Sequence, residues 1–299
     1  MSFRRGFRIR CALVSAAATS VLASSASRVE AQNADADDWM APRWVGDVTF
    51  LSANALLAGL TAGIVQRLEG GEFRDGFARG ALGGAVAYAG RRISAEEFWG
   101  AGLLARQVSA VGISIARNAA DGRPSFERLM FPVGPVRIYL DRSAGTSVQP
   151  KLALNDAGWL ISLALRSETQ FDWSASLSAG APVLRAPGNR VTVDGERVGG
   201  VMAGGTILLS DLPEEDARVA LPHERVHVLQ HDFAFLLWSD PIEERLLRRS
   251  GFTQAIYRYV DVGITFSSLA ALGLTSMGLD PGDRPPWEVE AHFLTDPRP

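Results

Sequence analysis

Two stretches of small residues, repeated at every fourth position, place the strongest constraint on what this chain can fold into. The first stretch, residues 48–66, carries no charged side chain, and the second, residues 73–88, follows a short turn. The repeated residues are Ala55, Gly59 and Gly63 in the first stretch and Gly76, Gly80 and Gly84 in the second. Positions four apart share one face of a helix, and small residues there let two backbones approach closely. The pattern predicts an N-terminal glycine-rich helical hairpin.

The length of these helices leaves two environments open. A helix that crosses a membrane needs about 20 predominantly apolar residues. Only the first stretch approaches that length, and the second carries Arg74, Asp75 and Arg79. A tightly packed soluble helix pair and a membrane anchor are therefore both retained. A third, amphipathic helix is expected over residues 95–119.

The first 31 residues have the pattern of a signal peptide. Residues 3–10 are basic, residues 11–26 are apolar, and small residues near Ala31 offer a cleavage site. We therefore expect export to the cell envelope, either into the periplasm or associated with a membrane, and both the general secretion and the twin-arginine routes stay open. The only cysteine, Cys11, would be lost on cleavage, so disulfides cannot stabilise the mature chain. Residues 32–44 are polar and are expected to form a linker.

The net charge and the hydrophobic periodicity limit the fold class and the kinds of partner that can be expected. A net charge of −3 with no dense basic stripe gives no indication of a nucleic-acid partner. From about residue 133 the helical period changes to alternation, which predicts an antiparallel β-sheet extending to about residue 210. The expected strands include VRIYLDR, PKLALN, GWLISLALR and FDWSASLSAG, with a hairpin turn at residues 155–158. The fold class is therefore α+β, with a helical region at 45–122.

The chemistry is carried by the sequence HERVH. His223 and His227 lie four residues apart on a predicted helix, so both imidazoles can reach one metal ion. Glu224 follows directly and can face a water molecule at the metal without binding the metal itself. This arrangement is typical of metal-assisted hydrolysis, with zinc as the cofactor and Glu224 as the general base.

These residues resemble the gluzincin superfamily of zinc metallopeptidases, over about residues 200–295. The resemblance includes a strand, VMAGGTILLSD, before the motif helix, where such peptidases bind extended substrate along an edge strand. It implies a glutamate on a later helix as third ligand, and Glu288 in Glu288-Val289-Glu290-Ala291-His292 matches the membrane-associated branch. His292 stands where that branch has an aspartate that orients a metal-bound histidine. Glu290 is the alternative third ligand.

His231 extends the histidine spacing but is not expected to bind the same ion. Eight residues of helix separate it from His223 by about 12 Å, which is too far for one tetrahedral zinc. We expect a surface position or a supporting contact behind the ligands. An oxyanion-stabilising donor is expected between the two halves of the site, where Tyr257, Arg258 and Tyr259 are candidates.

The resemblance implies a zincin-like HExxH helix with C-terminal helices, within a β-sheet and metal-site region at 123–299. The leading hypothesis is a zinc-dependent metallopeptidase of the cell envelope that acts on a polypeptide substrate. One alternative is a non-catalytic envelope protein with a structural or vestigial metal site, which a fourth protein ligand would favour. Another is a small membrane protein whose histidines are incidental, with a further apolar run at 262–279 as a second short membrane candidate.

Overall fold

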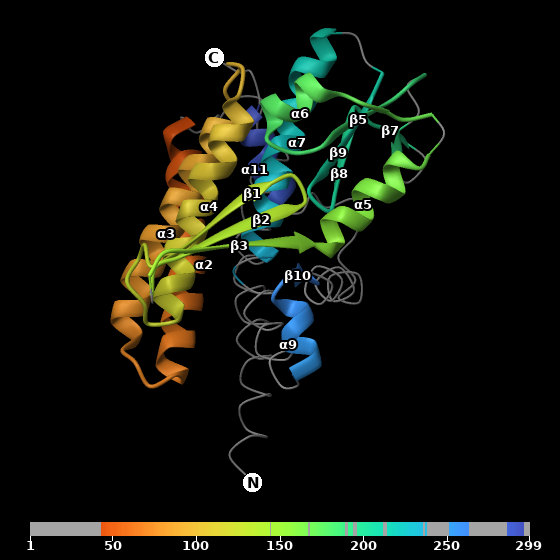
Figure 1. Ribbon diagram of the computed structural model, residues 1–299. Coiled ribbons are helices and arrows are strands. Elements are labelled where there is room, and N and C mark those ends of the chain that lie inside the picture. The colour runs from red at the N-terminus through yellow and green to blue at the C-terminus, as the bar shows by residue number, and fades with distance from the viewer. Residues whose placement is uncertain are drawn as a thin grey trace.

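Three long helices form one side of the molecule, one small sheet packs against them, and a second small sheet packs against the helix that carries the HERVH motif (Figure 1). The computed structural model describes residues 43–143, 145–166, 168–188, 191–193, 196–211, 214–235, 237, 251–262 and 286–295. The three helices are α2 (Arg43–Leu68), α3 (Phe73–Ser94) and α4 (Ala101–Ala120). The fold is a mixed α and β architecture, as the change of period along the sequence predicts.

Glycine allows these helices to pack at backbone contact. A Cβ atom on Gly84 would lie 2.3 Å from the carbonyl oxygen of Asn54 in α2, so no larger residue fits without movement. On the opposite side of α3, a Cβ atom on Gly83 would lie 2.5 Å from the carbonyl oxygen of Gly112 in α4. The predicted helical hairpin is confirmed, and the third helix begins at Ala101, later than expected.

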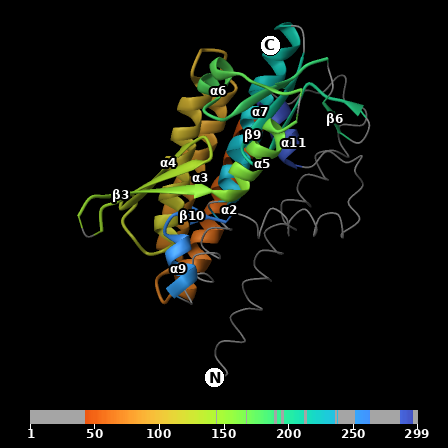
Figure 2. The ribbon, with the colours of Figure 1, turned by 45° about the vertical axis from the view of Figure 1, so that its right-hand side comes forward.

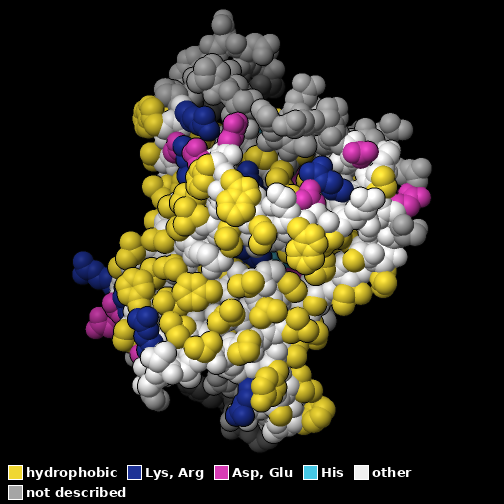
Figure 3. Space-filling view, turned by 45° about the horizontal axis from the view of Figure 1, so that its top comes forward, with side chains coloured by type: hydrophobic (Ala, Val, Ile, Leu, Met, Phe, Trp, Pro, Cys, Tyr) yellow, Lys and Arg dark blue, Asp and Glu magenta, His cyan; other side chains and the backbone are white. Residues whose placement is uncertain are grey.

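Within the described residues, α2 is the one helix long and apolar enough to cross a membrane. Its most apolar window has a mean hydropathy of 1.8, and 28% of that window is buried. Several of its large side chains are exposed, among them Trp44, Val48 and Leu56. Figure 3 shows broad hydrophobic coverage on one face of the molecule. The predicted signal peptide and nearly all of the apolar run at 262–279 lie outside the described residues.

The first sheet packs against α4. Its strands are β1 (Arg128–Val133), β2 (Val136–Asp141), β3 (Ser147–Ala153) and β10 (Val260–Asp261), in the order β1-β2-β3-β10. The first three are antiparallel neighbours, as predicted, whereas β10 pairs with β3 in parallel. A short helix, α9 (Gly251–Tyr257), precedes β10 and brings the chain back to this sheet.

The second sheet has helices on both faces. Its strands are β4 (Gln170–Phe171), β5 (Val183–Ala186), β9 (Thr206–Ser210) and β8 (Gly200–Ala203), in the order β4-β5-β9-β8. β5 and β9 are parallel, while a separate hairpin is formed by β6 (Thr192–Val193) and β7 (Glu196–Arg197). Leu208 packs on one face with Leu163 of helix α5 (Leu154–Ala164), and Ile207 and Leu209 pack on the other face with Val228. Val228 belongs to α7 (Glu214–Ala234), the helix that carries the HERVH motif.

Two of the predicted strands are helices. GWLISLALR and its expected turn at 155–158 lie in and just beyond α5, and most of FDWSASLSAG forms α6 (Trp173–Ala179). A short apolar run has no periodicity that separates a strand from a buried helix. In α6 the side chain of Asp172 accepts a hydrogen bond from the Ala175 N–H, and Gly180 ends the helix with φ of 67°. These signals at the two ends of the helix outweigh the alternation of apolar and polar residues that predicts a strand.

Buried ion pairs connect the motif helix to the rest of the fold. Asp232 of α7 accepts hydrogen bonds from Arg106 of α4 at 2.7 and 3.3 Å. Nearby, Arg137 of β2 donates to Asp156 of α5 at 3.2 Å, and both side chains are almost fully buried. The Arg106 guanidinium holds the pKa of Asp232 below its usual range although burial opposes this. The pairs therefore fix α7 against α4, and α5 against the first sheet.

Candidate metal centre

Helix α7 presents the two motif histidines on one face. The Nε2 atoms of His223 and His227 lie 3.0 Å apart, and their rings meet edge to face with centroids 4.7 Å apart. Because the residues are four apart, successive turns of the helix bring both imidazoles to the same side. The predicted HERVH helix is confirmed, and its two nitrogens point to a common position.

The third group comes from α11 (Pro286–Thr295), which packs beside α7 in both views (Figures 1 and 2). The Oε2 atom of Glu288 lies 3.1 Å from the Nε2 atom of His223 and 3.4 Å from that of His227. The three ligand atoms all lie within 4.8 Å of one another, so they could hold a metal ion. The structure thus brings together His223, His227 and Glu288 from distant parts of the sequence.

The charges at this position are those of a cation site. The close approach of the His223 and His227 imidazoles holds the pKa of Glu288 far below its usual range, so the carboxylate is ionised. Burial by itself lowers the pKa of His227, but Glu288 and Glu224 outweigh it and raise that pKa. The Oε2 atom of Glu288 is buried and has no hydrogen bond of good geometry. A buried carboxylate oxygen that faces two imidazole nitrogens suits a bound cation.

Glu224 is buried between α7 and the outer strand β8. It accepts a backbone hydrogen bond from Met202, and its Oε2 atom is buried without a partner. A Cβ atom on Gly200 of β8 would lie 2.9 Å from the Cγ atom of Glu224, so this glycine makes room for the carboxylate. Burial raises the pKa of Glu224, although His227 and His223 oppose the shift. A carboxylate with a raised pKa is a better proton acceptor, as a general base requires.

Glu290, the alternative third ligand, faces a different set of groups. Its carboxylate accepts hydrogen bonds from Arg91 at 2.8 and 2.9 Å, from Asn54 at 3.2 Å and from Gln230 at 2.9 Å. Glu288 and Glu290 lie two apart on α11 and therefore point about 200° apart around the helix. Glu290 does not join the group formed by the two histidines and Glu288.

Gln230 is a site residue that the sequence reasoning missed. Its Oε1 atom lies 2.8 Å from the Nδ1 atom of His227, on the side of the ring away from Glu288. A hydrogen bond of this kind was expected from the position of His292, but Gln230 supplies it to His227. The signal was available, because residues 227 and 230 are three apart on one helix and such positions are neighbours.

The two remaining histidines have separate surroundings. The Nε2 atom of His292 lies 3.9 Å from the Oε2 atom of Glu288, its ring centroid is 4.7 Å from that of His223, and its side chain is 54% exposed. His231 lies away from the metal-ligand group, as its spacing predicts. His231 is partly exposed, and its Nδ1 atom is buried near the ion pairs of Arg106 and Arg137. Burial lowers the pKa of His231.

The candidate oxyanion donors are not brought to the centre. Tyr257 is buried against Lys151 of the first sheet, with the ammonium 3.7 Å from the ring centroid, and the carbonyl of Arg258 accepts a hydrogen bond from Gln149. Tyr259 is exposed and its carbonyl pairs with β3. These residues hold α9 and β10 at the β3 edge of the first sheet.

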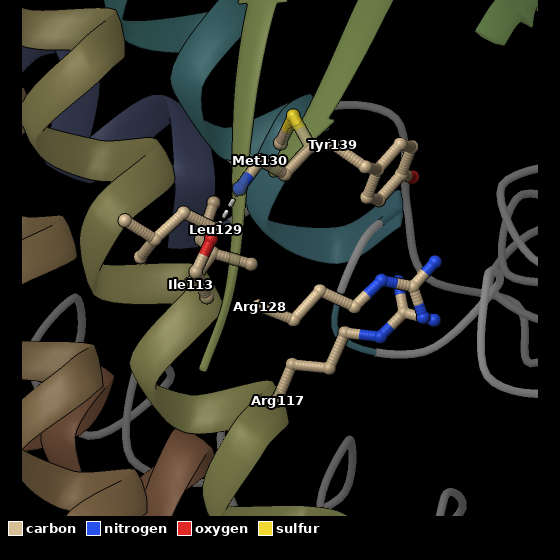
Figure 4. A pocket seen from close by; sticks show the side chains of 7 residues that line it. Ile113, Arg117, Arg128, Leu129, Met130 and Tyr139 are labelled. Carbon is tan, nitrogen blue, oxygen red and sulfur yellow. Dashed lines mark hydrogen bonds between the residues drawn. The ribbon is translucent and has the colours of Figure 1, made fainter. Parts of the chain in front are cut away.

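A separate pocket lies between α4 and the first sheet (Figure 4). It is lined by Ile113, Arg117, Arg128 and Tyr139 among others, and the two guanidinium groups lie side by side. Its free space suits about one water molecule. None of the metal-ligand group lines it, so it is distinct from the candidate metal centre.

Comparison with protein-family models, with curated proteins and with solved structures finds no match for this chain.

Proposed function

We propose that the protein is a zinc-dependent hydrolase, most simply a metallopeptidase of the cell envelope. The observation that carries the proposal is the convergence of His223, His227 and Glu288 beside a buried Glu224. Two imidazoles and one carboxylate are the ligand set of catalytic zinc sites that leave one position open. This set also matches the gluzincin resemblance of the motif.

The distances between the ligand atoms support a tetrahedral ion. Zinc binds nitrogen and carboxylate oxygen at about 2.0–2.2 Å, which places neighbouring tetrahedral ligands about 3.3 Å apart. The separations among His223 Nε2, His227 Nε2 and Glu288 Oε2 are 3.0, 3.1 and 3.4 Å. An ion can therefore enter with small side-chain adjustments.

The chemistry follows from the neighbours of the three ligands. Zinc, when bound, supplies a Lewis acid that polarises a carbonyl oxygen and makes water more acidic. Glu224 accepts the proton of the attacking water at its carboxylate and returns it to the leaving amine. Because Glu224 is 5% exposed, its negative charge is poorly solvated and the transfer is favoured.

The edge of β8 supports a polypeptide as substrate. β8 is the outer strand of the second sheet, and its Met202 N–H donates to Glu224. An extended peptide that lies along this edge would place a backbone carbonyl next to Glu224 and the two histidines. Side-chain preference would then depend on the residues that flank β8.

A second candidate function is a structural metal site in an envelope protein. The observation that favours it is the position of His292, whose Nε2 atom is 3.9 Å from the Oε2 atom of Glu288. A rotation of this exposed side chain would supply a fourth protein ligand, and structural zinc sites fill all four positions. In that case Glu224 would have no catalytic task.

Placement in the envelope is part of the proposal. The apolar helix α2 supports association with a membrane, and the basic-then-apolar pattern of residues 1–31 supports export. Separation of membrane and soluble fractions, before and after a carbonate wash, tests the first point. N-terminal sequencing of the mature protein tests cleavage near residue 31.

The catalytic proposal is tested by zinc content and peptide cleavage in matched variants. His223→Ala should lose bound zinc, whereas Glu224→Gln should keep zinc and lose about 10²- to 10⁴-fold of the cleavage rate, since only the base is removed. Glu97→Gln is the control, because Glu97 is exposed in the loop between α3 and α4. Full cleavage by a zinc-loaded Glu224→Gln protein would refute Glu224 as the base. Absence of cleavage in the wild type together with a His292→Ala variant that loses zinc would favour the structural site.

A further inference from the structure

A continuous set of hydrogen bonds, buried where it meets Arg91 and Asn54, connects His227 to the N-terminal helices. Gln230 uses its amide nitrogen to donate to the Trp287 carbonyl and to Glu290 Oε2, each at 2.9 Å. Both of these atoms can only accept, so the amide nitrogen must face them and the amide oxygen must face His227. The orientation of the Gln230 amide is therefore determined by its partners.

This orientation dictates where His227 carries its proton. An amide oxygen only accepts, so the Nδ1 atom of His227, 2.8 Å away, must be the donor. Its Nε2 atom is then the nitrogen whose lone pair points towards His223 and Glu288. Gln230 thereby fixes both the tautomer and the direction of the ring, as a hydrogen-bond partner of a metal-binding histidine must.

Glu290 is in turn held by the helical hairpin. The Nη1 atom of Arg91 in α3 donates to both of its oxygens, and Asn54 in α2 donates to Oε1 while accepting from Arg91 at 2.7 Å. Arg91 and Glu290 are 3% and 5% exposed, so water cannot substitute for these partners. The same Gln230 amide binds the Trp287 carbonyl, one residue before Glu288, and so connects two of the three proposed ligands.

We propose that Gln230 is a positioning residue for the metal centre, and that Arg91 and Glu290 hold it in place. The inference rests on the proposed metal-binding function and extends it to the N-terminal helices. It gives the glycine-rich hairpin a part in the site: the close packing of α2 on α3 sets Asn54 and Arg91 at the distance that Glu290 requires.

The test compares zinc affinity in two glutamine variants of the full mature chain. Gln230→Met keeps the length of the side chain and removes its hydrogen bonds, and zinc affinity measured against a competing chelator should fall about 10- to 100-fold. The matched control is Gln107→Met in α4, which removes a hydrogen bond to the Pro132 carbonyl in β1. The control should bind zinc as the wild type does.

Two further readouts separate positioning from a general loss of structure. In zinc-loaded wild type, nitrogen-15 NMR should show the His227 proton on Nδ1, and this proton should exchange with water faster in Gln230→Met. The double variant Arg91→Met, Gln230→Met should lose less zinc affinity than the sum of the losses in the two single variants, because both residues act on His227.

The outcomes distinguish this inference from the proposed function. A wild type that binds no zinc overturns both. If the wild type binds zinc and needs Glu224 for cleavage, but Gln230→Met keeps wild-type affinity and the Nδ1 proton of His227, only the positioning inference fails. A Gln230→Met protein that loses zinc affinity but keeps the His227 proton on Nδ1 with wild-type exchange also overturns it.

Discussion

The buried pair of Arg91 and Glu290 gives the sharpest stability prediction. Their side chains are 4% and 7% exposed, with the Nη1 atom of Arg91 2.8 Å from a Glu290 oxygen. Replacing Arg91 by Met leaves the Glu290 carboxylate buried without its cation. Removing one partner of a buried ion pair costs about 3–5 kcal/mol. Asn54 and Gln230 still donate to Glu290, so we expect the lower end, about 3 kcal/mol.

The assay is thermal and urea unfolding of the metal-free protein at pH 7. For a chain of this size, about 3 kcal/mol corresponds to a fall in Tm of about 6–12 °C. The control is Arg92→Met, since the neighbouring Arg92 forms a half-exposed pair with Asp47 at 3.3 Å that should contribute at most about 1 kcal/mol. Adding Glu290→Gln to Arg91→Met should recover part of the loss, because the unpaired charge is removed. Equal Tm values for the two arginine variants, or no recovery, would refute the reasoning.

Three further predictions concern packing, local structure and pH. Gly84→Ala should destabilise the protein by about 1–3 kcal/mol, because the added Cβ atom meets the Asn54 carbonyl at 2.3 Å. Urea unfolding measures this loss, and an unchanged midpoint would contradict the close packing of α2 on α3. Gly158→Ala should stabilise by about 0.5–1 kcal/mol, because residue 158 lies inside α5 with open space around it, whereas a hairpin turn there would make the change costly. Without metal, Glu288→Gln should reduce the free energy of unfolding most between about pH 4.5 and 6.5. The lowered pKa of Glu288 stabilises the fold above the usual value of 4.5, and the raised pKa of His227 stabilises it below the usual value of 6.5, so both contributions are present only in this range. A loss that does not vary with pH in urea titrations would contradict the ion pair.

The parts of the fold that could be predicted depend on local patterns. The fourfold spacing of glycine identified α2 and α3, because close packing of two helices leaves a direct mark in the sequence. The HERVH spacing likewise identified α7, whereas the segment VMAGGTILLSD, expected as one strand, is a hairpin of β8 and β9 that turns at Gly204 and Gly205. In each case the residues that make the contact are near one another in the chain.

The parts that were missed depend on contacts between distant segments. The parallel pairs β3–β10 and β5–β9 join strands that are separated by other elements, and no local pattern marks them. The sequence of α5 predicts a strand because an uninterrupted apolar run of this length suits either structure. The partners of Glu290 are in α2, α3 and α7, so the ion pair that holds Glu290 away from the metal-ligand group is visible only in three dimensions.

The location of zinc in the folded protein tests the central claim most directly. Crystals grown with zinc should give an anomalous scattering peak at the zinc absorption edge, about 2.0–2.2 Å from His223 Nε2, His227 Nε2 and a Glu288 carboxylate oxygen. A peak at any other position, or none among these three atoms at saturating zinc, would contradict the account.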